Sequence, residues 1–363
     1  MKIISDNMMP IWQEQIDIGS AETPVPETPE NVSLFSHCRD ALFMAARYCP
    51  TPGKRVMIPA YTCVTVYNPF AELGWEIAFY PVGTDLRINA QAFREVLHTF
   101  RPSAVVAHPY YGTDLNDEEL GLLAEAKVQG ALIIEDLTQS TFSTQNADVV
   151  DVFVGSLYKW FPITDGGFLR SDVLPPRLDA GLPEDTMYHK RKLYAQTIFR
   201  CYLENGDPMM RKAARRLEKD AAAAHPYVVP YRMSDFSRRV YASCDRETNN
   251  ARRLENCRYL YERLKDCKKC RLIWDDISEV RSGPLWFPLY VADREYMRDV
   301  VEKRCGFTAP RLWGNQHPEA HLDAATDYVT SHIVCPTCGQ NYTTEDMERI
   351  AVAIETADMP DVR

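Results

Sequence analysis

The first 160 residues alternate short apolar runs with segments of helical periodicity. The predicted strands are residues 55–59, 76–80, 104–108, 131–136 and 149–154, and the predicted helices are residues 36–48, 62–74, 90–99 and 116–129. Apolar strands separated by helices are typical of a parallel sheet whose two faces are both covered. The pattern predicts an α/β fold, a three-layer α/β/α sandwich with a mixed, mostly parallel sheet.

The whole chain is predicted to consist of three parts. Residues 1–32, which include a proline-rich acidic stretch, are predicted to be an extended N-terminal segment, and residues 33–230 the large domain. The large domain ends with a basic helical region at 177–225. Residues 231–363 are predicted to be a smaller α/β domain, with a long helix that Ser234 caps and that carries an apolar stripe to Leu264. A strand at 286–291 and helices at 294–303 and 344–356 complete it.

Three polar or aromatic residues follow predicted strands directly. Tyr61, His108 and Asp136 lie at or just past the carboxyl ends of three apolar runs. Ligands of open α/β sheets collect at these ends, so the three side chains are candidates for the walls of a binding pocket. For His108, a hydrogen-bonded core histidine is an equal alternative.

A lysine in aromatic and apolar company follows Asp136 by 23 residues. Lys159 lies between Tyr158 and Trp160, and Asp165-Gly166-Gly167 follows shortly after. Pyridoxal phosphate (PLP) needs a lysine amine that bonds its aldehyde and a carboxylate that keeps its ring nitrogen protonated. Apolar surroundings are expected to lower the pKa of the lysine and make it nucleophilic. The alternative is a core aspartate and a loop lysine without a shared function.

Composition excludes several other classes. The net charge of −10 disfavours a nucleic-acid partner, and no apolar run approaches membrane-spanning length. Eleven cysteines, an odd number, and an N-terminus without an apolar signal core indicate reduced thiols and a cytoplasmic location. No glycine-rich nucleotide motif of the dehydrogenase or P-loop type is present.

Six short sequence motifs, called words below, occur in the same order as in the DegT/DnrJ/StrS family of PLP-dependent aminotransferases, and each resembles its counterpart there. This family has the fold type I of the aspartate aminotransferase superfamily. The words are SHCRDAL (36–42), VMIPAYTC (56–63), IED with Gln139 (134–139), SLYKW with DGG (156–167), YRMS (231–234) and CGQNY with EDM (338–347). No single word is specific, but their order over some 300 residues is. The resemblance implies transfer of an amino group from glutamate or a similar donor to a nucleotide-linked keto sugar.

The resemblance also implies roles for single residues. Lys159 would bond the cofactor and later move the proton on the substrate carbon, and Asp136 would pair with the ring nitrogen. The remaining cofactor-binding residues would be Cys38, Arg39, Cys63, Gln139 and Ser156. Cys38 and Arg39 would form the phosphate-binding turn, Ser156 would bind the phosphate through its hydroxyl, and Gln139 would lie beside the ring. A solvated arginine is the alternative for Arg39.

Substrate and partner residues follow from the same comparison. Tyr61 and His108 would face the substrate, and Tyr231 and Arg232 would reach the active site of a second subunit, which implies a homodimer with shared sites. Cys38, Cys63 and Pro230 depart from the family pattern of a glycine, an aromatic residue and an asparagine. These departures motivate a second hypothesis, a catalytically degenerate binding or regulatory protein. A PLP enzyme for a non-sugar substrate is a third.

Two further features of the sequence each have two alternative interpretations. Two C-x-x-C pairs, at 267–270 and 335–338, have the internal spacing of zinc ligands, but the gap of 65 residues between them favours reduced, partly buried thiols over a shared metal site. The basic run at 189–192 is a candidate contact for a diphosphate, and a solvated helix face is its alternative.

Overall fold

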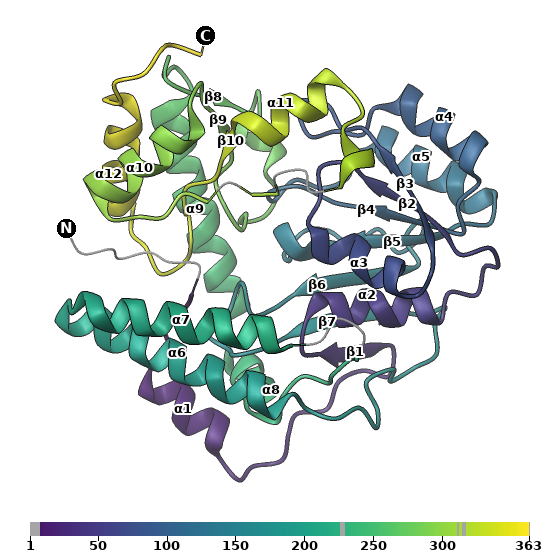
Figure 1. Cartoon of the computed structure of the whole chain (residues 1–363), viewed down its shortest axis with the longest axis horizontal. Helices are drawn as coiled ribbons and strands as arrows, with labels where there is room; N and C mark the ends of the chain where they lie inside the picture. Colours follow the sequence, from purple (N-terminus) through teal and green to yellow (C-terminus); the bar gives the residue numbers. More distant parts are fainter. Residues whose placement is uncertain (1–7, 226–228, 311, 314–316, 363) are drawn as a thin grey trace.

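The computed structural model describes residues 8–225, 229–310, 312–313 and 317–362 and is built around a seven-stranded sheet (Figure 1). The strands are β1 (Val32–Phe35), β2 (Arg55–Pro59), β3 (Glu76–Tyr80), β4 (Ala104–Ala107), β5 (Leu132–Asp136), β6 (Val152–Ser156) and β7 (Gly167–Ser171). Their order is β1-β7-β6-β5-β4-β2-β3. Strand β7 runs antiparallel to β1 and β6, and the pairings among β2 to β6 are parallel. The predicted mixed, mostly parallel sheet is confirmed.

Alternate residues of each central strand face opposite cores. Val56 and Ile58 of β2 pack with α2 (Cys38–Arg47) and α3 (Val64–Glu72), whereas Met57 packs with α4 (Ala90–Phe100) and α5 (Asp117–Val128). All three strand residues are fully buried. Continuous apolar runs arise here because both faces of the sheet are covered, which gives the three layers visible in Figure 1.

Two predictions about helices need correction. The N-terminal segment is not extended throughout, because α1 (Gln13–Ser20) forms in it and packs against α8 (Asp235–Ser243). The long helix expected after Ser234 is two helices, α8 and α9 (Arg246–Leu264). Cys244 is extended between them, and the Asp245 side chain accepts a hydrogen bond from Thr248 N, so the aspartate starts a new helix.

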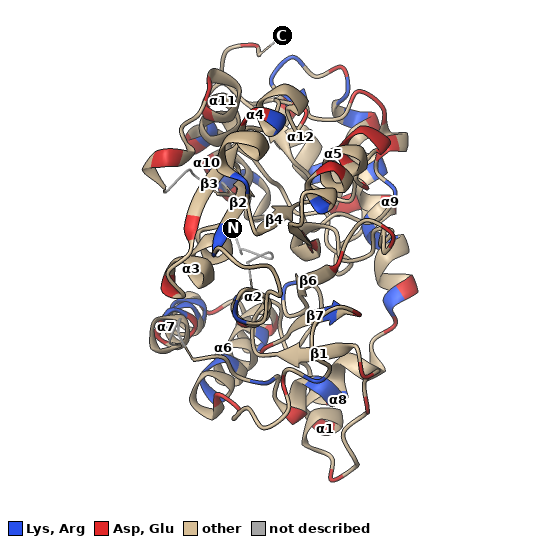
Figure 2. Cartoon of the chain, turned by 90° about the vertical axis from the view of Figure 1, so that its right-hand side faces the viewer, with Lys and Arg blue, Asp and Glu red and all other residues tan. Residues whose placement is uncertain are grey.

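Helices α6 (Thr186–Asn205) and α7 (Pro208–Ala224) form an antiparallel pair beside the sheet. Figure 2 shows Lys and Arg gathered along this pair. The basic run at 189–192 lies on α6, where the residues have separate partners. Nδ1 of His189 lies 2.6 Å from Oγ1 of Thr164, and the buried Lys192 forms an ion pair with Glu218.

The C-terminal elements surround a small antiparallel sheet of β8 (Arg271–Leu272), β9 (Leu289–Tyr290) and β10 (Ile333–Val334). Its helices are α9, α10 (Arg294–Cys305), α11 (Ala324–His332) and α12 (Thr344–Glu355). The strand predicted at 286–291 is therefore only two residues long. Leu260 of α9 and Met57 of β2 belong to one hydrophobic core, which continues from the large sheet into this region. Within the described ranges, no helix combines the length and apolarity that crossing a membrane requires.

Candidate active site

Lys159 and Asp136 line one pocket at the carboxyl ends of β5 and β6. This pocket, called the inner pocket below, has about 440 Å³ of empty space, part of it open to solvent. Its lining residues are His37, Cys38, Arg39, Leu42, Cys63, Thr65, Val66, Asp136, Thr138, Ser156, Tyr158, Lys159 and Trp313. The structure thus brings together six of the predicted site residues, Cys38, Arg39, Cys63, Asp136, Ser156 and Lys159, from four separate sequence words.

The Asp136 carboxylate is held from several sides. Its Oδ1 accepts a hydrogen bond from Thr138 N at 2.9 Å, and the Cys38 thiol lies 3.7 Å from the same oxygen. Its Oδ2 lies 3.7 Å from Nδ1 of His108, and both side chains are 2% exposed. Burial lowers the pKa of His108, which the nearby Asp136 only partly offsets, so the imidazole is neutral at neutral pH.

His108 therefore lies behind Asp136. Its Nε2 lies 2.7 Å from Oγ1 of Thr62, and the ring is not among the groups that line the inner pocket. The hydrogen-bonded core histidine, the alternative considered for the sequence, describes its position better than a pocket wall. Nδ1 of His108 lies 3.4 Å from the backbone carbonyl oxygen of Asp136 and so helps to position the residue whose carboxylate faces the pocket.

The electrostatics of Lys159 differ from the expectation. Burial lowers the pKa of its amine, but Tyr158, Cys63, Asp136 and Cys38 raise it, and the net pKa is raised above the ordinary value. The prediction that apolar surroundings lower this pKa is wrong, because it overlooked the acidic groups that meet at the pocket. The free amine is therefore an ammonium ion at neutral pH.

The N-terminus of α2 points its first residues, Cys38 and Arg39, at the inner pocket. Backbone N–H groups at a helix start favour an anion such as a phosphate. Strand β7 supports this turn closely. A Cβ atom added to Gly167 would lie 2.3 Å from the carbonyl carbon of His37 and 2.4 Å from Cys38 N, so only glycine allows this approach.

Asp165 connects this turn with the YRMS segment. Its carboxylate accepts hydrogen bonds from the backbone N–H and hydroxyl of Ser234 at 2.8 and 2.6 Å. Ser36 N donates to the carbonyl of Tyr231, and Gly166 N donates to the carbonyl of Ser36. Three of the recognised words thus hold one another in place beside the cofactor turn.

Besides His108, four more predicted residues lie outside the inner pocket. Tyr61 is fully buried, with its hydroxyl 2.8 Å from that of Tyr111. Gln139 is buried in the short helix η1 (Leu137–Gln139), and neither polar atom of its side chain has a hydrogen-bond partner among the described residues. Tyr231 packs its ring against that of His225. Arg232 forms ion pairs with Glu184 and Asp235 of its own chain.

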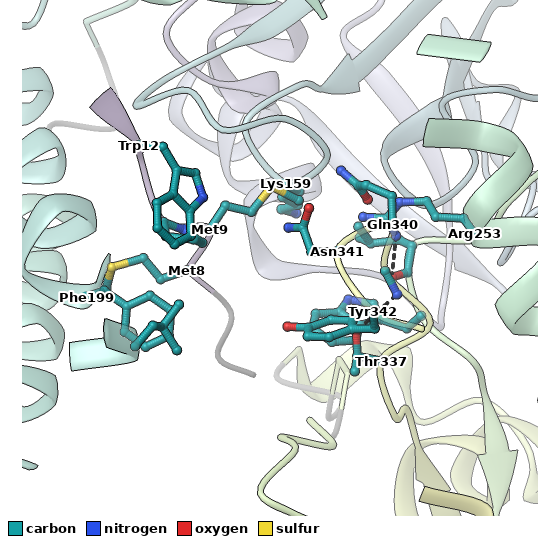
Figure 3. A pocket seen from close by; sticks show the side chains of 15 residues that line it. Met8, Met9, Trp12, Lys159, Phe199, Arg253, Thr337, Gln340, Asn341 and Tyr342 are labelled. Atoms are coloured by element: carbon teal, nitrogen blue, oxygen red, sulfur yellow. Dashed lines mark hydrogen bonds between the residues drawn. The ribbon is translucent and has the colours of Figure 1, made fainter. Parts of the chain in front are cut away.

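A second cavity, called the outer pocket below, also has Lys159 in its wall and has about 990 Å³ of empty space, part of it open to solvent (Figure 3). Its apolar side comes mostly from the N-terminal segment and α6, with Met8, Met9, Trp12, Phe199 and Leu203. Its polar side includes Arg253, Thr337, Gln340, Asn341 and Tyr342. Figure 3 shows the two groups facing each other across the cavity.

Arg253 and Gln340 anchor the polar side of the outer pocket. The Arg253 guanidinium donates to the carbonyls of Pro284 and Leu285 and lies 4.5 Å over the ring of Trp160. Gln340 Nε2 donates to the carbonyl of Trp160 at 2.6 Å. Since Trp160 follows Lys159 directly, the closing word CGQNY supports the position of the lysine from the C-terminal part of the chain.

The residues of the inner pocket fit PLP. The Ser156 hydroxyl is buried without a hydrogen-bond partner among the described residues, at the strand end that faces the α2 N-terminus, as expected for a phosphate ligand. A buried carboxylate, Asp136, and an amine, Lys159, line the same pocket. Lys159 and Asp136 would hold the two ends of the ring system, and Ser156 with the α2 turn would hold the phosphate.

The sequence predictions missed the residues that come from distant segments. Trp313 lines the inner pocket from the C-terminal region, and its ring lies 5.6 Å from that of His108. Trp313 has a φ of 50°, unusual for a non-glycine residue. No local pattern marked it, nor Met8 and Met9. Gln340 and Tyr342 were within a recognised word, and that word was the only available signal.

The two C-x-x-C pairs do not meet. Cys335 and Cys338 are fully buried, and burial raises the pKa of each thiol to about 12. The hydrogen bond from Cys270 lowers the pKa of Cys267 to about 6. The four cysteines form no metal-ligand cluster in the described part of the chain.

No protein-family profile and no curated protein matches the chain. Solved structures do resemble it. A DegT DnrJ EryC1 StrS aminotransferase from Brucella abortus is 17% identical, with a TM-score of 0.60 over 89% of this chain and 84% of that one. Sugar aminotransferase CalS13 from Micromonospora echinospora is 16% identical, with a TM-score of 0.65 over 98% and 94%.

A third similar structure contains a cofactor. NtdA from Bacillus subtilis, with bound cofactor PMP, is 14% identical, with a TM-score of 0.66 over 98% of this chain and 86% of that one. These identities establish similarity of fold, and the coverage extends over nearly all of both chains. The chain therefore has the fold that these aminotransferases share, as its sequence words predicted.

Proposed function

We propose that the protein is a PLP-dependent aminotransferase that moves an amino group from glutamate or a similar donor to a nucleotide-linked keto sugar. The observation that carries the proposal is the inner pocket, where Lys159, Asp136, Ser156 and the α2 N-terminus meet. The similar structures that are aminotransferases, one of them a sugar aminotransferase, support the same activity.

Each residue has a separate task in this proposal. When bound, PLP supplies an electron sink that stabilises negative charge on the substrate carbon. Asp136, whose Oδ1 accepts a hydrogen bond from Thr138 N, would hold a proton on the ring nitrogen. Lys159 would bond the cofactor aldehyde and would move a proton at the substrate carbon. The raised pKa of its free amine means that this lysine readily accepts a proton.

The outer pocket is the proposed substrate site, because Lys159 forms part of its wall. Among the described residues that line it, Arg253 and Lys159 carry a positive charge and none is acidic. Its composition suits a substrate with one anionic group and a substantial apolar part. The basic run at 189–192 lines neither pocket, so its assignment to a diphosphate loses support.

This composition keeps a second candidate open, a PLP enzyme that acts on a non-sugar keto substrate. The apolar side made by Met8, Met9 and Trp12 favours it. A single-turnover assay separates the candidates. The PMP form of the enzyme is mixed with keto-sugar nucleotides or with free keto acids, and return of the PLP absorbance is followed. A saturable response to small keto acids alone would select the non-sugar candidate.

The homodimer and the cytoplasmic location are also part of the proposal. The support for shared active sites is the YRMS segment, which lies next to the cofactor turn and leaves Arg232 30% exposed. Sedimentation of the holoenzyme measures the subunit number.

The central test is covalent capture of the cofactor. The protein is loaded with PLP, reduced with borohydride and mapped by peptide mass spectrometry. We expect the pyridoxyl group on Lys159 and loss of the label in Lys159→Ala. Lys127, which is paired with Asp151 at the far end of β6, provides the control substitution Lys127→Ala and should leave labelling unchanged. Absence of any specific label would favour the binding-protein hypothesis instead.

A further inference from the structure

Two histidines and an aspartate form a buried cluster behind the cofactor turn. His37 precedes α2, Asp40 lies in its first turn, and His225 follows α7. One ligand-type atom from each residue lies within 4.8 Å of the other two. We propose that these three residues, called the buried triad below, bind a divalent transition-metal ion of the zinc type.

The contacts of His225 carry this proposal. Its Nε2 is buried, has no hydrogen-bond partner among the described residues, and lies 3.6 Å from Oδ1 of Asp40. This separation is too long for a hydrogen bond. It is close to the edge of a zinc coordination tetrahedron, roughly 3.3–3.4 Å for bonds of about 2.05 Å. His37 Nδ1 lies 3.8 Å from Oδ2 of the same carboxylate.

The other nitrogen of His225 has the partner that metal-binding histidines usually have. Its Nδ1 lies 2.8 Å from Oδ2 of Asp185, the residue that caps α6. With Nδ1 donating to Asp185, Nε2 carries a lone pair directed at Asp40. A carboxylate that supports a histidine in this way fixes its tautomer and raises its basicity toward a metal.

The chemistry of the donors selects the kind of metal. Two imidazoles and one carboxylate suit zinc, cobalt and similar ions better than calcium or magnesium, which prefer oxygen ligands. The Ser36 hydroxyl, 3.0 Å from Nδ1 of His37, is a further oxygen beside the triad. The side chains of Asp40 and His225 are at most 1% exposed, so a bound ion would be enclosed and structural.

The location gives the ion a specific task. It would join the start of α2, which carries the cofactor-turn residues Cys38 and Arg39, to the end of α7, and through Asp185 to the start of α6. The start of α2 is far in the sequence from both α6 and α7. The alternative is a protonated His225 that bridges Asp40 and Asp185 without a metal, and metal analysis distinguishes the two.

The test uses the full-length PLP-loaded protein, purified through a tag without histidines, stripped with a chelator and titrated with Zn²⁺ against a competing indicator. We expect about one zinc per chain, and Co²⁺ should give the visible absorption of a low-symmetry, few-coordinate site. His225→Gln should abolish both signals. Asp185→Asn, which leaves the side-chain volume nearly unchanged, should weaken zinc affinity about 10- to 100-fold.

Cys267→Ser with Cys270→Ser is the matched control, because the half-buried Cys267, whose thiol has a pKa lowered to about 6, and the buried Cys270 are competing zinc ligands. The control should retain the zinc. The proposal is overturned if the wild type binds no zinc or cobalt after stripping. It is equally overturned if binding is lost in the cysteine control but unchanged in Asp185→Asn and His225→Gln.

Discussion

Substituting Gly167 by alanine tests how tightly β7 supports the cofactor turn. The added Cβ would lie 2.3 Å from the carbonyl carbon of His37, 2.4 Å from Cys38 N and 2.5 Å from the carbonyl oxygen of His37. All three are backbone atoms, so no side-chain rotation relieves the overlap. An ordinary carbon–carbon contact of about 3.5 Å requires the turn to retreat by roughly 1.2 Å.

This displacement has two expected costs. Forcing extra volume into a packed site costs roughly 1–3 kcal/mol of unfolding free energy. The phosphate also loses well-aligned N–H donors at the helix start, and a hydrogen bond to a charged group contributes about 1.5–3 kcal/mol. We therefore expect PLP affinity to fall by at least about tenfold, since 1.4 kcal/mol corresponds to a factor of ten.

The assay is a PLP titration followed by absorbance, alongside thermal unfolding of the apo protein. Gly121→Ala is the matched control, because Gly121 lies inside α5 and an added Cβ meets no atom within 4 Å. The control should bind PLP normally and gain roughly 0.5–1 kcal/mol of stability. Unchanged PLP affinity in Gly167→Ala at normal stability would refute the role assigned to this contact.

Three other perturbations address the site and its surroundings. Asp136→Asn should keep much of the cofactor binding but slow the glutamate half-reaction about 10²- to 10³-fold, measured by stopped-flow absorbance, and equal rates in both proteins would contradict the role of Asp136. Mixing inactive Lys159→Ala and Arg232→Ala protomers should restore part of the activity if active sites are shared, whereas full activity of Arg232→Ala alone would exclude sharing through this residue. Burial raises the pKa of Glu135 to about 8, so the folded chain holds a proton that the unfolded chain loses above about pH 4.5. Stability should fall as pH rises from about 4.5 to about 8, by roughly 5 kcal/mol at most, and Glu135→Gln should remove this slope in pH-dependent denaturant melts.

The central strands were predictable because their environment is uniform. The bounds of β2 and β3 agree residue for residue with the predicted runs. In β2, which lies between β3 and β4, four of five residues are buried, since strands covered on both faces need apolar side chains at nearly every position. In β3, the edge strand, only Phe79 and Tyr80 are buried. Strand β6 begins three residues later than predicted, because Val149 and Val150 are apolar but belong to the preceding turn. β1 and β7 lacked such runs and were not predicted.

The site was predictable only where residues lie inside contiguous words. Lys159, Asp136 and Ser156 are positioned by their own strands, and the order of the words placed them on one sheet edge. Trp313 reaches the inner pocket through tertiary packing alone. The pKa of Lys159 depends on the combined effect of Tyr158, Cys63 and Asp136, and the spacing of these residues in the sequence does not predict that effect.

Lys159 lies in a wall that the inner and outer pockets share. A reagent that enters from the side of Met9 and Asn341 therefore meets the amine without crossing the space assigned to the phosphate and the ring. Inhibitors built to fill the outer pocket can compete with substrate while leaving the cofactor in place. Their selectivity would depend on the N-terminal residues Met8, Met9, Pro10 and Trp12, which line this pocket.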